Sequence, residues 1–313
     1  EKYKIITRER AYHGVTVAAG SLTSLPANLA HFDAPLEALG ILRTDHPHYY
    51  RGALGDESEA QFVERITGNL ETLIQEEGPE TIAAFVAEPV TGASGVIVPP
   101  AGYYEKVQAI LERYDILFWA DEVITGFGRT GHLFGCETVN IHAPAQMTFA
   151  KQLSSAYYPI SAAVIRGDLY EAMVEPSAEV GIFGHGYTYS GHPVGCAAAL
   201  KTLEIYERDN LYANAADVGD YLQTRLGELR DHEAVGEVRG VGLIAAVELV
   251  EDKSSRSPAL ELAKRVTWLC QENGLIVRNV AGNALALCPP LIITREQVDE
   301  IVDKLKRSID QAM

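Results

Sequence analysis

The sequence has little positive charge. Its 313 residues include 26 Lys and Arg against 43 Asp and Glu, a formal net charge of −17. Nucleic acids and anionic membranes both require a basic face on the protein that binds them. The composition therefore argues against both kinds of partner.

Long apolar runs and closely spaced cysteines are also missing. No uninterrupted apolar run reaches the roughly 18 residues that a membrane-spanning helix needs. The four cysteines lie far apart and form no C-x-x-C pair: Cys136, Cys196, Cys270 and Cys288. Isolated cysteines of this kind are typical of reduced thiols, so we expect a cytoplasmic protein without disulfides.

The usual spacing of metal-binding residues is absent as well. The nine histidines show no H-x-x-x-H or H-x-x-E pattern on a predicted helix. Asp121 and Glu122 are adjacent in a predicted strand, where neighbouring side chains point to opposite faces and cannot bind one ion together. We expect no catalytic metal.

Apolar segments do alternate with amphipathic ones along the first two thirds of the chain. Strands are predicted at 81–90, 116–124, 146–151 and 160–165, and helices at 101–115 and from about Pro193 onward. Continuous apolar strands that alternate with helices are typical of a mostly parallel sheet covered on both faces. This portion is predicted to be an α/β domain.

The pattern of predicted strands and helices changes after about residue 210. Strands predicted at 241–250, 274–279 and 284–293 are interleaved with helices, and Thr294 and Gln297 occupy capping-box positions at the start of the last helix. We therefore expect a large domain over 1–210 and a smaller C-terminal α+β domain over 211–313.

Three glycines spell the dinucleotide-binding pattern G-x-G-x-x-G: Gly126, Gly128 and Gly131. That pattern requires a tight turn between a strand and a helix whose N-terminus binds the pyrophosphate. Here the glycines begin five residues after Asp121, and the sequence that follows has no sustained helical period. We interpret them as residues that shape a loop beside a site.

Chemically reactive residues follow three of the predicted strands. Glu88, Asp121 and Lys151 each stand at or just after the end of an apolar run, the edge at which parallel sheets bind ligands. A buried carboxylate needs a cation or hydrogen-bond donors beside it. A lysine that forms a Schiff base and an aspartate that faces a pyridinium nitrogen are what pyridoxal 5'-phosphate (PLP) requires. Spacing alone leaves a second interpretation open, in which Lys151 is a solvated residue at the sheet edge.

Six segments together resemble the class III aminotransferases, and most closely the ω-amino acid or amine:pyruvate transaminase branch. They occur in the family's order along the chain: "AYHG", "AEPVTGASGVIVPPAGYY", "WADEVITGFGRTG", "TFAKQLSSAYYPISA", "GHGYTYSGHPVGCAAAL" and "CPPLIIT". The resemblance implies the PLP-transferase fold of type I, with PLP as the cofactor.

The resemblance also implies roles around the cofactor ring. Lys151 would form the Schiff base and move the proton, and Asp121 would pair with the pyridine nitrogen. Val123 would pack under the ring, Tyr12 would stack on its other face and also contact substrate, and His13 would lie beside Tyr12.

Two further roles concern the phosphate and the substrate. Thr188 would bind the cofactor phosphate of the other subunit, which implies a homodimer or a dimer of dimers with shared active sites. Glu88 resembles the acid near the cofactor that pairs with a mobile arginine. Arg278 resembles that arginine, which binds the substrate carboxylate.

The function implied is transamination of a primary amine or ω-amino acid with pyruvate or a related oxo acid as acceptor. Two alternatives remain: other PLP chemistry on the same fold (an aminomutase or a decarboxylase), or a truncated and catalytically silent chain. The second arises because the family's N-terminal portion, which includes a phosphate-binding Gly-Ser/Thr loop, has no counterpart before "EKYKIITRERAYHG".

Overall fold

A six-stranded sheet forms the frame of the first two thirds of the molecule. The computed structural model describes residues 1–30 and 32–313. The strand order is β2-β1-β3-β4-β5-β6, with parallel pairing up to β5 and antiparallel pairing of β6. The strands are β1 (Lys4–Arg8), β2 (Ile41–Thr44), β3 (Ile82–Ala87), β4 (Leu117–Asp121), β5 (Gln146–Phe149) and β6 (Ala162–Ile165). The prediction of a mostly parallel sheet is confirmed.

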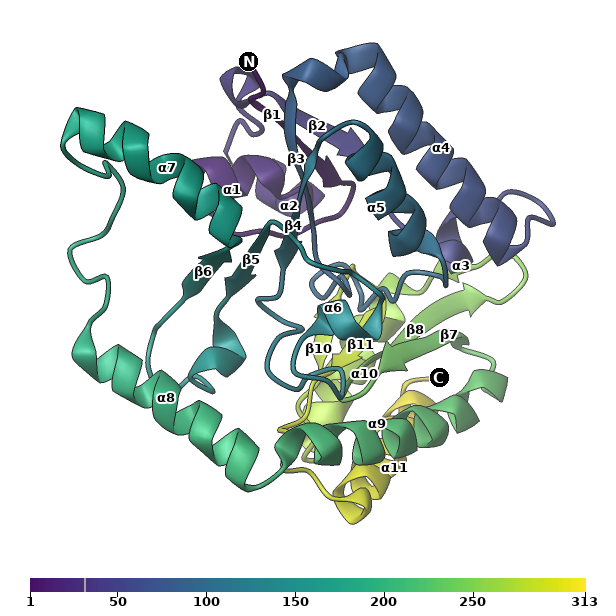
Figure 1. The fold of residues 1–313 in the computed structure, drawn as a ribbon. Coiled ribbons are helices and arrows are strands. Elements are labelled where there is room, and N and C mark those ends of the chain that lie inside the picture. Colours follow the sequence, from purple (N-terminus) through teal and green to yellow (C-terminus); the bar gives the residue numbers. More distant parts are fainter. Residues whose placement is uncertain (31) are drawn as a thin grey trace.

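Two helices, α4 and α5, cover one face of this sheet (Figure 1). Phe62 and Leu70 of α4 and Leu111 of α5 share a buried core with Phe85 and Phe118 of the sheet. The helices of this part are α1 (Val17–Leu22), α2 (Pro26–Leu29), α3 (Tyr49–Gly52), α4 (Glu59–Glu77), α5 (Tyr103–Arg113), α6 (Gly135–Thr138), α7 (Gly167–Val180) and α8 (Pro193–Arg208), with 3₁₀ helices at Glu37–Leu39, Pro79–Thr81 and Lys151–Leu153.

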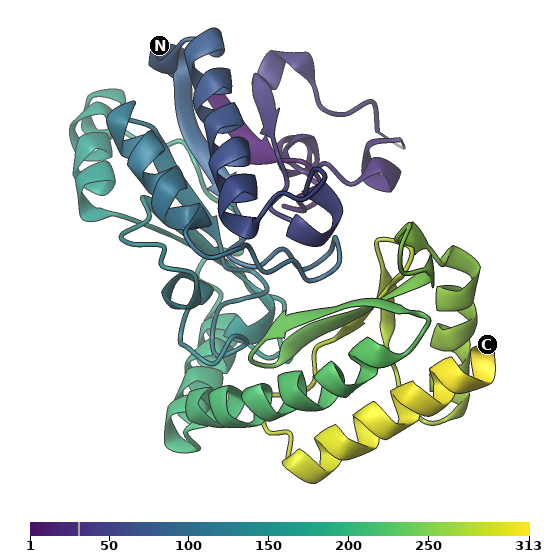
Figure 2. The same ribbon diagram turned by 90° about the vertical axis from the view of Figure 1, so that its right-hand side faces the viewer.

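The C-terminal part builds a separate antiparallel sheet of order β10-β11-β8-β7, with β9 paired to β8. Figure 2 shows α9 and α11 side by side along this sheet. Its elements are β7 (Val235–Val241), β8 (Ile244–Asp252), β9 (Ser257–Pro258), β10 (Arg278–Val280), β11 (Ala284–Leu287), α9 (Leu211–Gly227), α10 (Leu260–Glu272) and α11 (Arg295–Ala312), with a 3₁₀ helix at Glu228–Asp231.

The predicted capping box of the last helix is present, because Gln297 N donates to Thr294 Oγ1 and Thr294 N donates to Gln297 Oε1. The strand predicted over 274–279 is shorter than expected. It begins only at Arg278, after an extended stretch in which Ile276 is fully outside the core at 91% exposure. The predicted domain boundary falls in the turn between α8 and α9, and the division there stays a prediction.

The glycine-rich loop packs tightly against α9. A Cβ on Gly128 would lie 2.8 Å from Tyr212 Cδ1, and one on Gly131 would lie 3.0 Å from Ala216 Cα. A Cβ on Gly126 would lie 2.8 Å from the Glu122 carbonyl oxygen. These glycines therefore permit close packing, in agreement with the loop-shaping interpretation.

One surface of the sheet edge is apolar and uncovered. Helix α7 has no buried residue, and it projects with the segment that follows it away from the rest of the fold (Figure 1). We call this surface the α7 face. Its exposed apolar side chains are Val164, Tyr170, Val174, Val180, Ile182, Phe183, Tyr187 and Tyr189. Within 1–30 and 32–313, no helix combines the length and apolar character needed to cross a bilayer.

Candidate active site

The ends of three neighbouring parallel strands bring the predicted acids and lysine to one edge of the sheet. Asp121 is the last residue of β4, Glu88 directly follows β3, and Lys151 follows β5 after one residue. β4 lies between β3 and β5 in the sheet. The charges of Asp121 and Glu88 both act on Lys151, so the three groups share one electrostatic environment.

Asp121 is buried, and its carboxylate has two partners. His13 Nδ1 lies 2.7 Å from Asp121 Oδ2, and Val123 N donates to Asp121 Oδ1 at 3.1 Å. In the described part of the chain, no Lys or Arg forms an ion pair with Asp121. The other ring nitrogen of His13, Nε2, is buried without a hydrogen-bond partner there. This corner of the site thus holds a buried anion and an unpaired polar atom.

Glu88 is fixed by backbone donors. Its Oε1 accepts from Tyr12 N at 3.2 Å and its Oε2 from Gly92 N at 3.1 Å. Burial raises the pKa of Glu88; the nearby His13 opposes that shift and the charge of Asp121 adds to it. The carboxyl group thereby ties the segment after β1 to the loop after β3.

Arg8 is a functional neighbour that sequence reasoning missed. Its guanidinium is fully buried and donates to the Glu88 carbonyl at 2.7 Å, to Thr91 Oγ1 at 3.2 Å and to Tyr104 Oη at 2.9 Å. The available signal was a charged residue at the end of the apolar strand "KIITR". Arg8 holds the backbone that presents Glu88.

Lys151 begins a 3₁₀ helix with a left-handed backbone, φ 38°. Although its side chain is exposed in the single chain, partial desolvation by the surrounding protein lowers the pKa of its ammonium. Asp121 and Glu88 oppose that shift, and the positive charge of Arg278 adds to it. Arg278 is therefore close enough to act on Lys151, but in the described residues it forms no ion pair with Glu88.

Glu122 has partners of its own on the opposite side of the strand. Its carboxylate accepts from Thr125 Oγ1 at 2.5 Å, from Gly135 N at 2.9 Å and from Cys136 N at 2.7 Å. Glu122 N in turn donates to the Thr148 carbonyl of β5 at 3.0 Å. These donors explain how a second buried acid is tolerated beside Asp121.

Of the other residues expected from the resemblance, Tyr12 and Val123 lie at the site and Thr188 lies in a separate segment. Tyr12 and Val123 are partly buried and contribute their backbone N–H groups to Glu88 and Asp121. Thr188 lies in the exposed segment after α7. Their roles toward a cofactor stay predictions.

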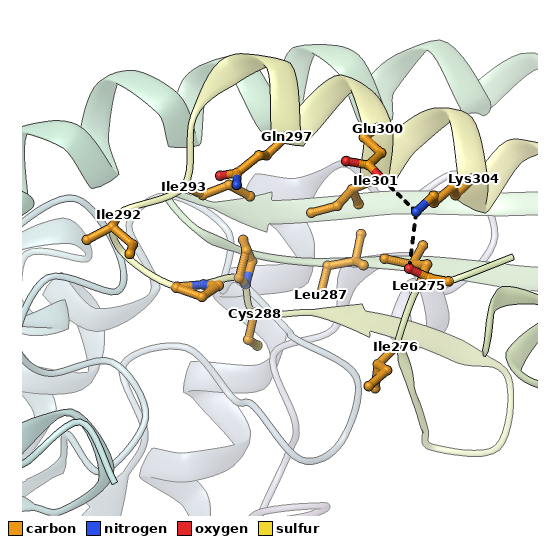
Figure 3. A pocket seen from close by; sticks show the side chains of 13 residues that line it. Leu275, Ile276, Leu287, Cys288, Ile292, Ile293, Gln297, Glu300, Ile301 and Lys304 are labelled. Atoms are coloured by element: carbon orange, nitrogen blue, oxygen red, sulfur yellow. Dashed lines mark hydrogen bonds and ion pairs between the residues drawn. The ribbon is translucent and has the colours of Figure 1, made fainter. Parts of the chain in front are cut away.

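Two open hollows lie beside the site. One, of about 440 Å³, is drawn in Figure 3; Lys304 there contacts Glu300 at 2.6 Å and the Gly274 carbonyl at 3.2 Å, so its ammonium is already paired. The other, of about 750 Å³, lies between α8 and the segment after β11. Cys288 lines both hollows, and neither is lined by Asp121 or Lys151.

A model of the family Aminotransferase class-III matches residues 1–309. The chain belongs to the class-III aminotransferases. It is 45% identical to the diaminobutyrate–2-oxoglutarate transaminase of Halomonas elongata over 99% of this chain, and 46% identical to gamma aminobutyrate transaminase 1 of Solanum lycopersicum over 96% of it.

Solved transaminase structures share the fold over nearly the whole chain. A transaminase solved with L-alanine is 53% identical, with a TM-score of 0.96 over 98% of this chain and 72% of its own. The omega transaminase of Pseudomonas jessenii in complex with PMP is 48% identical, with a TM-score of 0.96 over 99% of this chain and 68% of its own. The expected fold is confirmed. The chain spans 67% of the Halomonas relative and 58% of the tomato one.

Proposed function

We propose that this chain carries the catalytic lysine of a PLP-dependent transaminase. It would move an amino group from a primary amine or ω-amino acid to pyruvate or a related oxo acid. The observation that carries the proposal is the meeting of Asp121 and Lys151 at adjacent strand ends in a chain of this family. The similarity to a gamma-aminobutyrate transaminase and to an omega transaminase supports the substrate class.

The residues present fit the cofactor. Asp121 is a buried carboxylate that contacts His13 and has no Lys or Arg paired to it in the described part, and such a group favours a protonated ring nitrogen beside it. PLP, when bound, supplies an electron sink for the carbanion at the substrate Cα. Lys151 would hold the cofactor aldehyde as a Schiff base. Tyr12 and Val123 would enclose the ring.

The chain's own residues would then handle protons and substrate orientation. Desolvation lowers the pKa of Lys151, which increases the neutral amine available to take a proton from the substrate Cα. His13 holds Asp121 in place through the 2.7 Å contact. Arg278 would bind a substrate carboxylate in a bidentate manner, and Glu88 would offer that arginine an alternative partner when the substrate carries no carboxylate.

We further propose a homodimer, or a dimer of dimers, whose subunits meet at the α7 face. Apolar surfaces of this kind mark protein–protein contacts, and Thr188 lies in the same exposed segment, from which it would bind the cofactor phosphate of the other subunit. Light scattering should give the dimer mass, and Tyr187→Glu should lower it toward the monomer. A cytoplasmic location is also proposed, in line with four free cysteines.

The experiment is to saturate the protein with PLP, reduce it with borohydride and map the pyridoxyl adduct. The adduct should lie on Lys151, be absent from Lys151→Ala and persist in the control Lys201→Ala. An adduct on another lysine would overturn the proposal. Turnover is then measured with 4-aminobutyrate or an arylalkyl amine and either pyruvate or 2-oxoglutarate; an adduct without any turnover would favour the silent-chain alternative.

A further inference from the structure

Two acids lie directly opposite each other in the C-terminal sheet. Glu237 of β7 and Glu248 of β8 are cross-strand partners, and Glu248 is only 3% exposed. Like charges in facing positions destabilise a sheet, and burial increases the cost. This pair therefore depends on the cations around it.

Three charged or ionisable residues face the two acids, and the Asn283 amide also donates to Glu248 Oε1 at 3.4 Å. Arg239 Nη1 lies 2.5 Å from Glu237 Oε2 and 2.5 Å from Glu248 Oε2. Arg51 Nε donates to Glu248 Oε1 at 2.7 Å, and His48 Nε2 lies 2.9 Å from Glu237 Oε2. We define the β7–β8 ion cluster as Glu237, Glu248, Arg239, Arg51 and His48. It joins the segment after β2 to the C-terminal sheet.

Three residues of the cluster have the ligand types and spacing of a metal site, but an arginine already lies between the two carboxylates. Ligand atoms of His48, Glu237 and Glu248 all lie within 4.8 Å of one another. The guanidinium of Arg239 bonds both carboxylates and that of Arg51 bonds Glu248, so two positive charges already face the two acids. The net effect of these partners is to lower the pKa of Glu248 in spite of its burial.

Arg239 also extends beyond the cluster to the loop after β3. Its Nε donates to the Gly95 carbonyl at 2.8 Å. A Cβ on Gly95 would lie 2.7 Å from Arg239 Nη2, and the glycine has a φ of 119°, so this close approach requires glycine. Val90 and Val96 of the same loop pack against Ile244 in a small buried cluster.

That loop begins at Glu88. The Glu88 carboxylate closes the loop's first turn through Gly92 N, and Thr91 and Ile97 pair as an isolated bridge at its base. The position of the carboxylate relative to Tyr12 N therefore depends on the shape of the whole loop. Arg239 fixes the half of the loop opposite Glu88.

We propose that Arg239 is a positioning residue that couples the C-terminal sheet to Glu88, and through Glu88 to Tyr12. The Arg239 guanidinium bridges the two facing acids and donates to the Gly95 carbonyl at the same time. The inference deepens the proposed function, on which its catalytic meaning rests. A lysine at this position would keep the positive charge. Its single ammonium group could not bond both acids and the Gly95 carbonyl together, as the forked guanidinium of arginine does.

Hydrogen exchange tests this coupling without any cofactor. In Arg239→Gln, exchange of the peptides that contain Tyr12 and Gly92 should be about tenfold faster, because their bonds to Glu88 open more often, while α11 keeps wild-type protection. Arg239→Lys should have the urea midpoint of wild type, whereas hydrogen exchange of the Tyr12 and Gly92 peptides should stay as fast as in Arg239→Gln. Arg225→Gln is the matched control, since Arg225 also bridges acids of the same domain, Glu228, Asp299 and Asp303, but contacts no site loop.

Unchanged exchange at Tyr12 and Gly92 in Arg239→Gln would overturn the inference. So would an acceleration spread evenly over the chain, or a recovery of loop protection in step with stability in Arg239→Lys, since both indicate a merely structural role. The proposed function fails on a different readout, the absence of a pyridoxyl adduct on Lys151, so the two failures are distinguishable.

Discussion

Replacing Gly219 by alanine should destabilise the protein, although the same change in the interior of a helix is usually stabilising. Gly219 lies in the middle of α9, where alanine normally gains about 0.5–1 kcal/mol over glycine. Its added Cβ would lie 2.5 Å from both the Cα and the carbonyl carbon of Gly242, in the turn between β7 and β8. Gly242 in turn packs against the backbone of Thr130: a Cβ on Gly242 would lie 2.5 Å from the Thr130 carbonyl carbon. Two stacked backbone segments must therefore move.

Overpacking of this kind costs about 1–3 kcal/mol, so we expect Gly219→Ala to lower the free energy of unfolding by about 1–2 kcal/mol. Gly68→Ala in α4 is the matched control, because a Cβ there meets nothing within 4 Å. That variant should be more stable than wild type by about 0.5–1 kcal/mol. Urea unfolding at one protein concentration compares the two variants. Equal shifts, or a stabilised Gly219→Ala, would refute the close packing of α9 on this turn.

Three further substitutions test charged side chains at and around the site. Glu122→Gln should cost about 1–3 kcal/mol of unfolding free energy, because one carboxamide oxygen cannot serve all three donors, whereas the exposed Glu64→Gln should stay within about 0.5 kcal/mol of wild type. Arg8→Met should cost about 3 kcal/mol or more by leaving buried acceptors unpaired, while Arg113→Met on the surface should have little effect in the same urea titration. Because desolvation lowers the pKa of Lys151 in the folded state, the unfolded chain binds more protons from that lowered pKa up to the ordinary value of 10.5, so this group makes stability rise with pH across that window. Lys151→Met should flatten the rise in urea midpoint as the pH is raised toward 10.5, and an unchanged slope would contradict the assignment.

The sequence could predict the strand ends because the rule for them is local. Apolar runs that end in Glu88, Asp121 and Lys151 indicate parallel strands, and parallel strands that are neighbours must present those ends at one edge. The first turn of α11 was equally predictable, because its capping box needs only Thr294 and Gln297.

The surroundings of the site were not predictable in the same way. Arg8 reaches Tyr104 across 96 residues, and Arg239 reaches Gly95 across 144. Such contacts depend on how α5 packs on the first sheet and how the second sheet packs on the loop after β3, which no spacing in one sequence reveals. The glycine pattern at Gly126 shows the converse difficulty. A local match to a phosphate-binding pattern arose from the need to pack a loop against α9.

Asp121, the last residue of β4, and Glu122, which follows it, illustrate how the fold selects one face for chemistry. Glu122 accepts from three neutral donors of its own loop, and it needs no cation since hydrogen bonds alone can stabilise a buried carboxylate. That loop packs directly over the carboxylate, and it leaves no room for a ligand on this side: a Cβ on Gly135 would already lie 3.1 Å from Glu122 Oε2. Asp121 has only His13 and one backbone N–H as partners, and it acts on Lys151. Of these two carboxylates, only that of Asp121 can therefore pair with a cationic ring. The same face carries the lysine that would bind it.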